Sequence, residues 1–167
     1  MVMNGKKGVI LGIANNKSIA YGIAKQCEAQ GATMAITYLN ERFEKKLTPI
    51  AEDLGCDGRL YPCDVSNPQE IKDLKESLEK DLGQIDFIVH SIAFAPKEGL
   101  TGRFYDISKE AFDIAMDISV YSLIEIVREL KPIMSDSCSV LTLSYYGGVK
   151  YIPNYNLMGV AKAALEM

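Results

Sequence analysis

A tyrosine and a lysine near the end of the chain are spaced for shared chemistry. Tyr155 and Lys162 lie seven residues apart in a segment predicted to be helical, and seven residues make nearly two turns, so both side chains project from one face. A tyrosine hydroxyl ordinarily has a pKa of about 10, and a neighbouring ammonium favours the phenolate and lowers that pKa. Such a tyrosine can hydrogen-bond a carbonyl oxygen on which charge develops. Taken alone, the pair is better explained as a half-buried aromatic residue and a solvated lysine.

A second pair, Tyr146 and Lys150, has the closer Tyr-x-x-x-Lys spacing. Gly147 and Gly148 lie between the two residues and Pro153 follows shortly, which favours a loop over a helix. We therefore expect that Tyr146 and Lys150 do not share a helical face.

The segment that begins at Gly12 resembles a phosphate-binding turn. Gly12 permits a tight turn at a strand end, and a helix beginning near Ser18 would offer free N–H groups and its positive dipole end to an anion. Gly22 is expected to let this helix pack closely on the strand. The spacing is not Gly-x-Gly-x-x-Gly, and Asn16 stands where a P-loop requires glycine before its lysine. An ordinary strand-to-helix turn remains open.

Short apolar runs and longer amphipathic periods alternate along the chain that carries these residues. The runs predict strands at 8–12, 33–38, 59–63, 86–90 and 139–143. The periods predict helices at 19–30, 41–54 and 68–82, from 108 to about 134, and from about 154 onward. Nearly continuous apolar strands are buried on both faces. We therefore predict an α/β fold, a Rossmann-like doubly wound parallel sheet, with 1–167 forming a single dinucleotide-binding domain.

Two features suggest that this domain is incomplete. The last helix has no stop signal before Met167, and the sheet lacks the strand to which that helix should return. The C-terminal part of the fold is therefore expected to be missing from this chain. The irregular connection 94–106 follows the fourth strand, where loops of a parallel sheet line the ligand crevice.

Composition excludes several classes of function. Of the 167 residues, 48% are hydrophobic and 24% charged, and the net charge of −4 argues against a nucleic-acid partner. The apolar stretch 8–14 is too short to span a membrane, so no membrane partner is expected. The cysteines lack zinc-ligand spacing, no metal site is expected, and reduced thiols suit a cytoplasmic protein. These cysteines are Cys27, Cys56, Cys63 and Cys138.

The motifs as a set resemble the bacterial enoyl-acyl-carrier-protein reductases of the short-chain dehydrogenase superfamily. The resemblance is carried by Gly12…Ser18-Ile19-Ala20-Tyr21-Gly22, Cys63-Asp64-Val65, His90-Ser91-Ile92-Ala93-Phe94-Ala95-Pro96, Ser144-Tyr145 and Tyr155-x6-Lys162. It implies NADH-dependent reduction of the trans-2 double bond of enoyl-acyl-carrier-protein thioesters in fatty-acid biosynthesis. It also implies that later strands and lid helices over the substrate lie beyond Met167.

The resemblance implies three overlapping sets of site residues. The cofactor-binding set is Gly12, Ser18, Ile19, Leu39, Asp64, Val65, Ser91, Ile92 and Lys162. The substrate-binding set is Ala93, Tyr145, Tyr155 and Met158. The catalytic set is Tyr145, Tyr155 and Lys162, with a weaker role for Tyr145.

Individual roles follow from the same resemblance. Residues 12–19 would hold the pyrophosphate, and Asp64 would accept a hydrogen bond from the adenine amine, with Val65 beside the ring. Ser91 and Ile92 would lie beside the adenosine ribose and the nicotinamide half. Lys162 would bind the nicotinamide ribose, and Tyr155 would stabilise the enolate through the thioester carbonyl. Met158 would touch the acyl chain.

Leu39 departs from the family pattern, because close relatives often carry glutamine there. Leucine cannot hydrogen-bond an adenosine ribose, while a 2′-phosphate would need a basic partner. The nearest candidate, Arg42, lies slightly late in the sequence. We therefore predict NADH rather than NADPH as the cofactor.

Two partners are implied. The substrate would arrive on an acyl carrier protein, and the apolar helix Ile118–Leu130 would pack across a two-fold axis in a homotetramer. The alternative for this helix is simple burial on the sheet.

Other functions remain open. A 3-oxoacyl thioester reductase would use Tyr146 with a serine thirteen residues earlier, but Ile133 stands there. A non-catalytic NAD(H)-sensing protein would not need Tyr155 and Lys162, and a P-loop phosphotransferase lacks its glycine. A hydrolase built on His90 and Ser91 is disfavoured, because adjacent strand residues point to opposite faces; we interpret His90 as structural.

Overall fold

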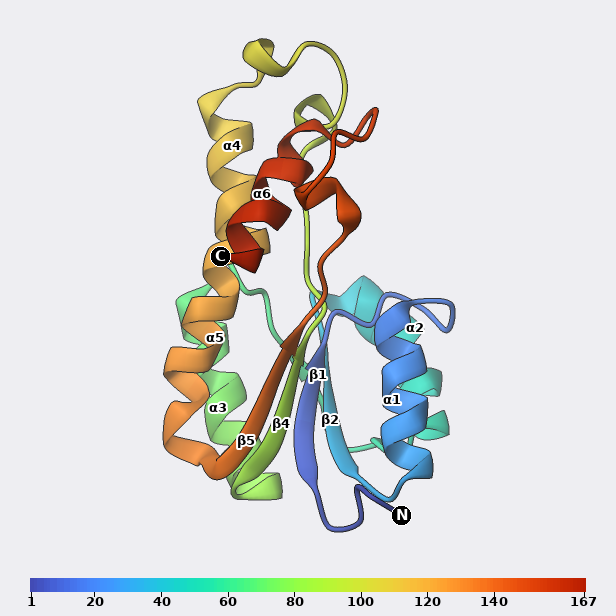
Figure 1. Cartoon of the computed structure of the whole chain (residues 1–167). Coiled ribbons are helices and arrows are strands. Elements are labelled where there is room, and N and C mark those ends of the chain that lie inside the picture. The colour runs from blue at the N-terminus through green and yellow to red at the C-terminus, as the bar shows by residue number, and fades with distance from the viewer. The chain divides into compact units, whose positions relative to one another are not determined.

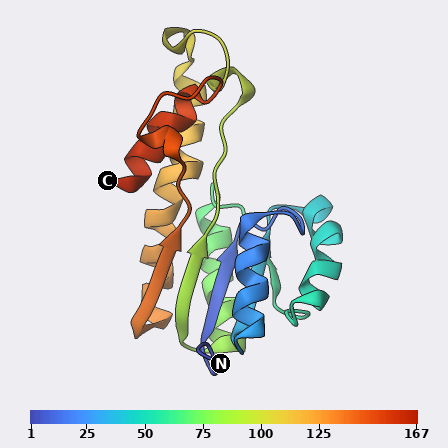
Figure 2. The ribbon, with the colours of Figure 1, turned by 45° about the vertical axis from the view of Figure 1, so that its right-hand side comes forward.

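The computed structural model describes all residues 1–167 and confirms the α/β class. Five parallel strands form one sheet in the order β3-β2-β1-β4-β5, with β5 at one edge (Figure 2). The strands are β1 (Lys7–Leu11), β2 (Thr33–Tyr38), β3 (Leu60–Pro62), β4 (Ile85–His90) and β5 (Met134–Thr142). The helices are α1 (Ile19–Ala29), α2 (Glu41–Asp53), α3 (Pro68–Leu82), α4 (Lys109–Met116), α5 (Ser122–Leu130) and α6 (Asn156–Glu166). No helix is long and apolar enough to cross a membrane.

The chain divides into two compact units. The sheet unit comprises Met1–Ser91 and Ile126–Thr142, and the helical unit comprises Ile92–Glu125 and Leu143–Met167.

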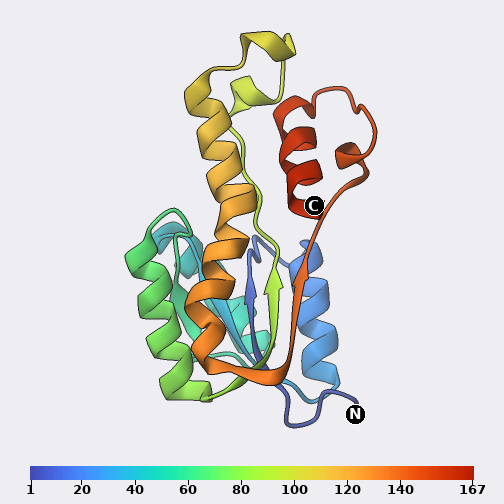
Figure 3. The same ribbon diagram turned by 60° about the vertical axis from the view of Figure 1, so that its left-hand side comes forward.

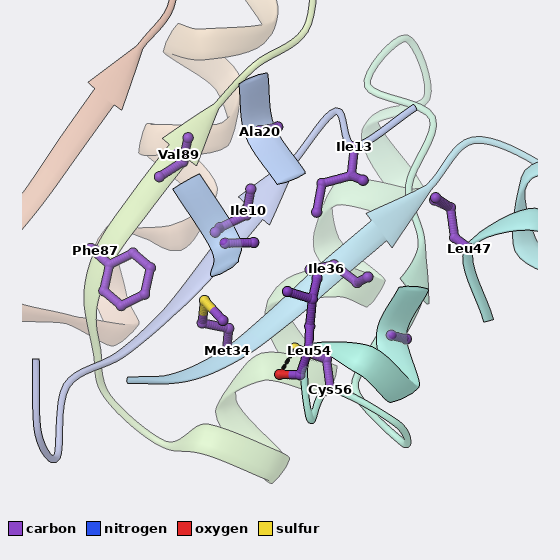
Figure 4. Packing of buried hydrophobic residues seen from close by; sticks show 12 residues of the cluster. Ile10, Ile13, Ala20, Met34, Ile36, Leu47, Leu54, Cys56, Phe87 and Val89 are labelled. Carbon is purple, nitrogen blue, oxygen red and sulfur yellow. Dashed lines mark hydrogen bonds between the residues drawn. The ribbon is translucent and has the colours of Figure 1, made fainter. Parts of the chain in front are cut away.

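The sheet unit is a Rossmann-like doubly wound layer structure. In Figure 1, α1 and α2 cover one face of the sheet and α3 covers the other. The central strands are buried on both faces, as continuous apolar runs predict for a parallel sheet, and Val9, Ile10 and Leu11 are fully buried. Figure 4 shows the core on the α1 side, where Ile10, Met34 and Ile36 from two neighbouring strands pack together.

Helix ends in the sheet unit follow the residues that the sequence offers as caps. The hydroxyl of Ser18 accepts a hydrogen bond from the Tyr21 amide at the start of α1, and Asn67 caps α3 in the same way. Gly31 follows α1 with φ 88°, a left-handed conformation that glycine adopts without strain.

The prediction for Gly22 was wrong. A Cβ atom placed on Gly22 would meet no atom within 4 Å, so this glycine does not bring α1 close to the strand. The close approach is at Gly8 on β1, where a Cβ atom would lie 2.6 Å from Cε2 of Phe87 on the paired strand β4.

Two alanine substitutions should therefore shift stability in opposite directions. Gly8→Ala forces overlap with Phe87 and should lower the free energy of unfolding by about 1–3 kcal/mol. Gly22→Ala meets open space inside a helix and should raise it by about 0.5–1 kcal/mol. Urea unfolding of the intact protein measures both changes, and equal effects of the two variants would contradict this packing.

The predicted start of the fifth strand at residue 139 was late by five residues. The helical region ends in a short 3-10 turn, Lys131–Ile133, and β5 then begins at once with Met134. Residues 134–138 include two serines and an aspartate, so no apolar run marks the beginning of β5.

The helical unit contains α4, α6 and the first turn of α5. α4 and α6 lie side by side in this unit (Figure 3). Between α4 and α5 the helix widens into one π-helical turn, Asp117–Tyr121, which the sequence period did not predict. The connection from β4 to α4 is irregular as predicted, with two short 3-10 turns at Lys97–Gly99 and Phe104–Asp106.

Candidate functional site

The sheet unit brings several predicted cofactor residues to one edge. Gly12 follows β1, Leu39 follows β2, Asp64 lies two residues beyond β3, and Ser91 follows β4. The carboxyl ends of parallel strands lie at the same edge, which is the ligand-binding edge of open α/β sheets. The chain order reverses between β1 and β4, so Gly12 and Ser91 flank the switch point of the topology.

The turn after β1 is shaped to leave backbone amides free. Gly12 has φ 93°, and the chain then folds around Asn15, whose carbonyl accepts from the Ser18 amide at 3.1 Å and from the Ser18 hydroxyl at 2.7 Å. The same hydroxyl accepts from the Tyr21 amide at 3.3 Å, so Ser18 organises the turn. The amides of Ile19 and Ala20 make no hydrogen bond within the chain. They are donors that an anion at the start of α1 can use.

Asp64 keeps one carboxylate oxygen available. Its Oδ1 accepts from both the amide and the hydroxyl of Ser66, at 2.9 and 2.7 Å, while Oδ2 makes no hydrogen bond within the chain. The amide of Asp64 donates to Glu70 at 2.7 Å, which fixes the turn after β3. Val65 is buried beside it. The arrangement suits a donor group presented to Asp64 Oδ2.

Leu39 presents an apolar side chain at the edge of the sheet, where it is 49% exposed. Asn40 beside it is used by α2, because its Oδ1 accepts from the amides of Arg42 and Phe43. At residues 39 and 40, the end of β2 therefore offers only the Asn40 side-chain amide nitrogen as an uncommitted polar group.

The helical unit brings together the residues predicted to meet substrate. The helix α6 begins at Asn156, so Tyr155 lies just outside it as its cap residue, and the prediction that one helix carries both Tyr155 and Lys162 was wrong. Met158 and Lys162 follow within α6 at i, i+4 spacing, on one stripe of the helix. The rings of Tyr155 and Tyr145 meet edge to face, with centroids 4.9 Å apart and planes at 71°. Ile92 and Ala93 belong to the same unit and open the connection that leads to α4.

Lys162 is a buried cation in α6. Only 6% of the residue is exposed, and its Nζ donates to the carbonyl of Leu143 at 2.7 Å. Burial lowers the pKa of Lys162, and the Glu166 carboxylate partly opposes this change. A buried ammonium with one fixed acceptor retains two protons that it can donate to a ligand.

The expected effect of Lys162 on the Tyr155 pKa was wrong. Burial raises the pKa of Tyr155 above the usual tyrosine value, Tyr145 adds to this rise, and Lys162 is not among the causes. The ammonium is instead hydrogen-bonded to Leu143. Tyr155 is therefore a neutral phenol at physiological pH, and its hydroxyl acts as a hydrogen-bond donor.

The Tyr146–Lys150 pair does not form a helical face, as predicted. Tyr146 lies in a 3-10 turn that ends at Gly148, and Lys150 follows it in irregular, exposed chain. Ile133, thirteen residues before Tyr146, is buried ahead of β5, at the opposite end of that strand from Tyr145. The residues of a Tyr-x-x-x-Lys site are therefore not assembled here.

The glycines of this turn have a packing role that sequence reasoning missed. A Cβ atom on Gly147 would lie 2.6 Å from Cε1 of Tyr155, and one on Gly159 of α6 would lie 2.8 Å from the Gly147 carbonyl oxygen. Three small residues, Gly147, Gly148 and Gly159, thus let the turn press against α6 and fix the Tyr155 ring. The glycine pair and the in-helix glycine were the available signal.

His90 is fully buried in the sheet unit, in agreement with a structural role. Its Nδ1 lies 3.3 Å from Oγ1 of Thr142, and that hydroxyl donates to the His90 carbonyl at 3.2 Å. The contacts join the carboxyl ends of β4 and β5. All four cysteines are free thiols, and burial raises the pKa of Cys63 to about 12, so this thiol is unreactive at neutral pH.

Comparison with known sequences places the chain beside one group of enzymes. A family model described as enoyl-(acyl carrier protein) reductase matches residues 12–167. The chain is 52% identical over 166 residues to the NADH enoyl-[acyl-carrier-protein] reductase FabI of Aquifex aeolicus, and 48% identical over 165 residues to enoyl-[acyl-carrier-protein] reductase [NADH] 1 of Rhizobium meliloti. These alignments cover 99% of the chain and 61% and 60% of the relatives, so the chain spans about three fifths of their length.

Solved structures give the same grouping. The crystal structure of the Aquifex aeolicus NADH reductase superposes with a TM-score of 0.96 at 51% identity, covering 99% of this chain and 71% of that one. The Anaplasma phagocytophilum reductase in complex with NAD gives 0.95 at 49% identity, covering 99% and 64%. The Bacillus cereus reductase with NADP+ and indole naphthyridinone gives 0.94 at 41% identity, covering 98% and 64%.

Proposed function

The chain belongs to the enoyl-(acyl carrier protein) reductase family, and from this membership we propose that it serves NADH-dependent reduction of the trans-2 double bond of enoyl-acyl-carrier-protein thioesters in fatty-acid biosynthesis. The observation that carries the proposal is the contact of Tyr155 with Tyr145 at the start of α6, together with the buried Lys162 inside that helix. Reduction of a double bond conjugated to a thioester requires a hydrogen-bond donor at the carbonyl oxygen, and Tyr155 has that chemistry.

The residues of the helical unit would act on the substrate as follows. The neutral Tyr155 hydroxyl donates to the thioester carbonyl and stabilises the enolate charge that forms when the β-carbon is reduced. A proton added to the α-carbon completes the saturated thioester. Tyr145 holds the Tyr155 ring by its edge and lines the substrate site with Ala93, and Met158 contacts the acyl chain. When bound, NADH would supply the hydride.

The sheet unit has the donors and acceptors that fit a dinucleotide. The free amides of Ile19 and Ala20 would hold the pyrophosphate beyond Gly12 and Ser18, and Asp64 Oδ2 would accept from the adenine amine with Val65 beside it. Ser91 of the sheet unit and Ile92 of the helical unit would lie beside the adenosine ribose and the nicotinamide half. Lys162 of the helical unit would donate to the nicotinamide ribose hydroxyls. Leu39 belongs to the same proposed cofactor site. The chain, 1–167, is proposed to be part of a single dinucleotide-binding domain.

Leu39 provides a test of cofactor choice. If it faces the adenosine ribose, Leu39→Arg places a guanidinium where a 2′-phosphate would lie, and kcat/KM for NADPH relative to NADH should rise about tenfold to hundredfold. Leu39→Ala is the matched control, since it removes the side chain without adding charge. An unchanged preference in the arginine variant would remove Leu39 from the ribose site.

The partners and compartment are proposed on the same basis. The family function implies an acyl carrier protein as substrate carrier, and the free cysteines suit the cytoplasm. A homotetramer is supported by α5 and the turn before it, where Tyr121 and Ile124 are 42% and 57% exposed. They line a shallow groove of about 600 Å³ with Val120, Ile114 and Met116. Light scattering of the intact protein should give four times the chain mass, and a monomer would defeat this assembly.

Substrate choice tests the proposed reaction against its main alternative. NADH oxidation by the intact protein is measured with a trans-2-enoyl thioester and with a 3-oxoacyl thioester of equal length. We expect turnover of the enoyl substrate alone, because Tyr146 and Lys150 do not share a helical face and so do not form the site that a carbonyl reductase would use. Turnover of the oxoacyl substrate alone would establish a carbonyl reductase, and NADH binding without turnover of either would favour a sensing role.

A further inference from the structure

The π-helical turn between α4 and α5 buries a polar side chain that the proposed chemistry does not use. Ser119 lies in this turn with no exposed surface. A buried hydroxyl is costly unless it is hydrogen-bonded, and π-helical turns occur frequently at functional sites. The partners of Ser119 therefore indicate what this turn positions.

The hydroxyl of Ser119 holds both backbone groups of Phe94. It accepts from the Phe94 amide at 3.0 Å, and it lies 3.0 Å from the Phe94 carbonyl oxygen, to which it can donate. Phe94 directly follows Ile92 and Ala93, and its own side chain is 52% exposed, so ring packing does not anchor this segment. The Ser119 hydroxyl thus gives the Phe94 backbone the hydrogen bonds that strand pairing provides before the end of β4.

The same hydroxyl also reaches α6. Ser119 Oγ lies 3.8 Å from the sulfur of Met158, a weak acceptor that competes with the Phe94 carbonyl for the single hydroxyl proton. Met158 is buried and lies on the same stripe of α6 as Lys162. Ser119 is therefore in contact with two of the segments that carry substrate-binding residues, and both contacts lie inside the helical unit.

We propose that Ser119 is a positioning residue. Its hydroxyl fixes the Phe94 backbone and the Met158 side chain relative to one another and so shapes the part of the substrate site that binds the acyl chain. The proposal rests on the proposed function for its substrate, and on the contacts of one side chain for its geometry. Loss of the hydroxyl leaves the Phe94 amide and carbonyl unpaired and frees the Met158 thioether. Binding of the acyl chain should then weaken, and the chemistry at Tyr155 should continue.

The test compares Ser119→Ala with Ser122→Ala. Ser122 is also fully buried, and its hydroxyl donates to the Ile118 carbonyl of its own helix at 2.6 Å. Ser119→Ala should speed hydrogen exchange of the Phe94 amide about tenfold and shift the Met158 methyl resonance. It should also raise KM for a long-chain enoyl thioester about tenfold, with kcat and the NADH dissociation constant within about twofold. Ser122→Ala should leave all of these unchanged.

Ser119→Cys fills the space with a slightly larger sulfur atom and keeps a weak donor, so it should give intermediate values, and it carries the same comparison if the alanine variant does not fold. Equal hydrogen-exchange rates of the Phe94 amide and equal Met158 resonances in Ser119→Ala and Ser122→Ala would show that Ser119 does not hold these two residues. A changed Phe94 exchange with an unchanged KM would overturn the role in substrate binding. If wild-type protein turns over no enoyl thioester, the proposed function fails. The Phe94 amide exchange rate and the Met158 methyl resonance still decide whether Ser119 holds these two residues.

Discussion

Tyr155→Phe should lower kcat for an enoyl thioester by about 10²- to 10³-fold and leave the NADH dissociation constant within about twofold. The substitution removes one hydroxyl and keeps the ring, so the edge-to-face contact with Tyr145 and the close packing on Gly147 persist. Because burial raises the pKa of Tyr155, the hydroxyl is protonated through the neutral range, and wild-type activity that depends on it should decline only at alkaline pH. Steady-state kinetics and cofactor titration measure both quantities.

Tyr146→Phe is the matched control for this substitution. Tyr146 is exposed and lies in the 3-10 turn, so removal of its hydroxyl should change kcat by less than about twofold. Equal losses in the two variants would assign the effect to the turn, and a fully active Tyr155→Phe protein would exclude Tyr155 as the donor.

Lys162→Met should raise the NADH dissociation constant about tenfold to hundredfold and lower turnover with it. Methionine keeps an apolar stem of similar length in α6, where Lys162 is buried, and it removes the ammonium that donates to Leu143 and would donate to the cofactor ribose. Hydrogen bonds to charged groups are worth about 1.5–3 kcal/mol, which sets the expected range. Calorimetric titration of NADH gives the constant directly.

Lys150→Met controls for the loss of a positive charge. Lys150 is exposed in irregular chain, and no change in NADH affinity beyond about twofold is expected. If Lys162→Met binds NADH as tightly as wild type but turns over slowly, Lys162 serves catalysis without holding the ribose, and its assigned role is wrong.

Much of the fold could be predicted because its signals are local. Apolar runs marked the buried strands β1, β2 and β4, the predicted helix start near Ser18 is confirmed by α1, and the predicted helix 68–82 is confirmed by α3. Placement of Gly12, Asp64 and Ser91 after parallel strands then followed from topology.

The remaining features depend on tertiary contacts that the sequence does not display. The sequence predicts one continuous helix from 108 to about 134 and gives no sign of the π-helical turn Asp117–Tyr121, so the burial of Ser119 in that turn could not be predicted. The raised pKa of Tyr155 comes from its surroundings and overrides the expected influence of Lys162. Gly22 lies inside α1 and Gly147 in the turn before α6, and of these two glycines only Gly147 meets a neighbouring ring.

The central claim is that this protein reduces a carbon–carbon double bond with Tyr155 at the thioester carbonyl. Its most direct test is a single turnover of the intact protein with NADH deuterated at the transferred position and trans-2-butenoyl thioester, with the product analysed by mass spectrometry and NMR. We predict a saturated thioester with one deuterium at the β-carbon, lost in Tyr155→Phe and retained in Tyr146→Phe. An unreduced enoyl thioester, together with deuterium on the hydroxyl-bearing carbon of a 3-oxoacyl substrate, would contradict the claim.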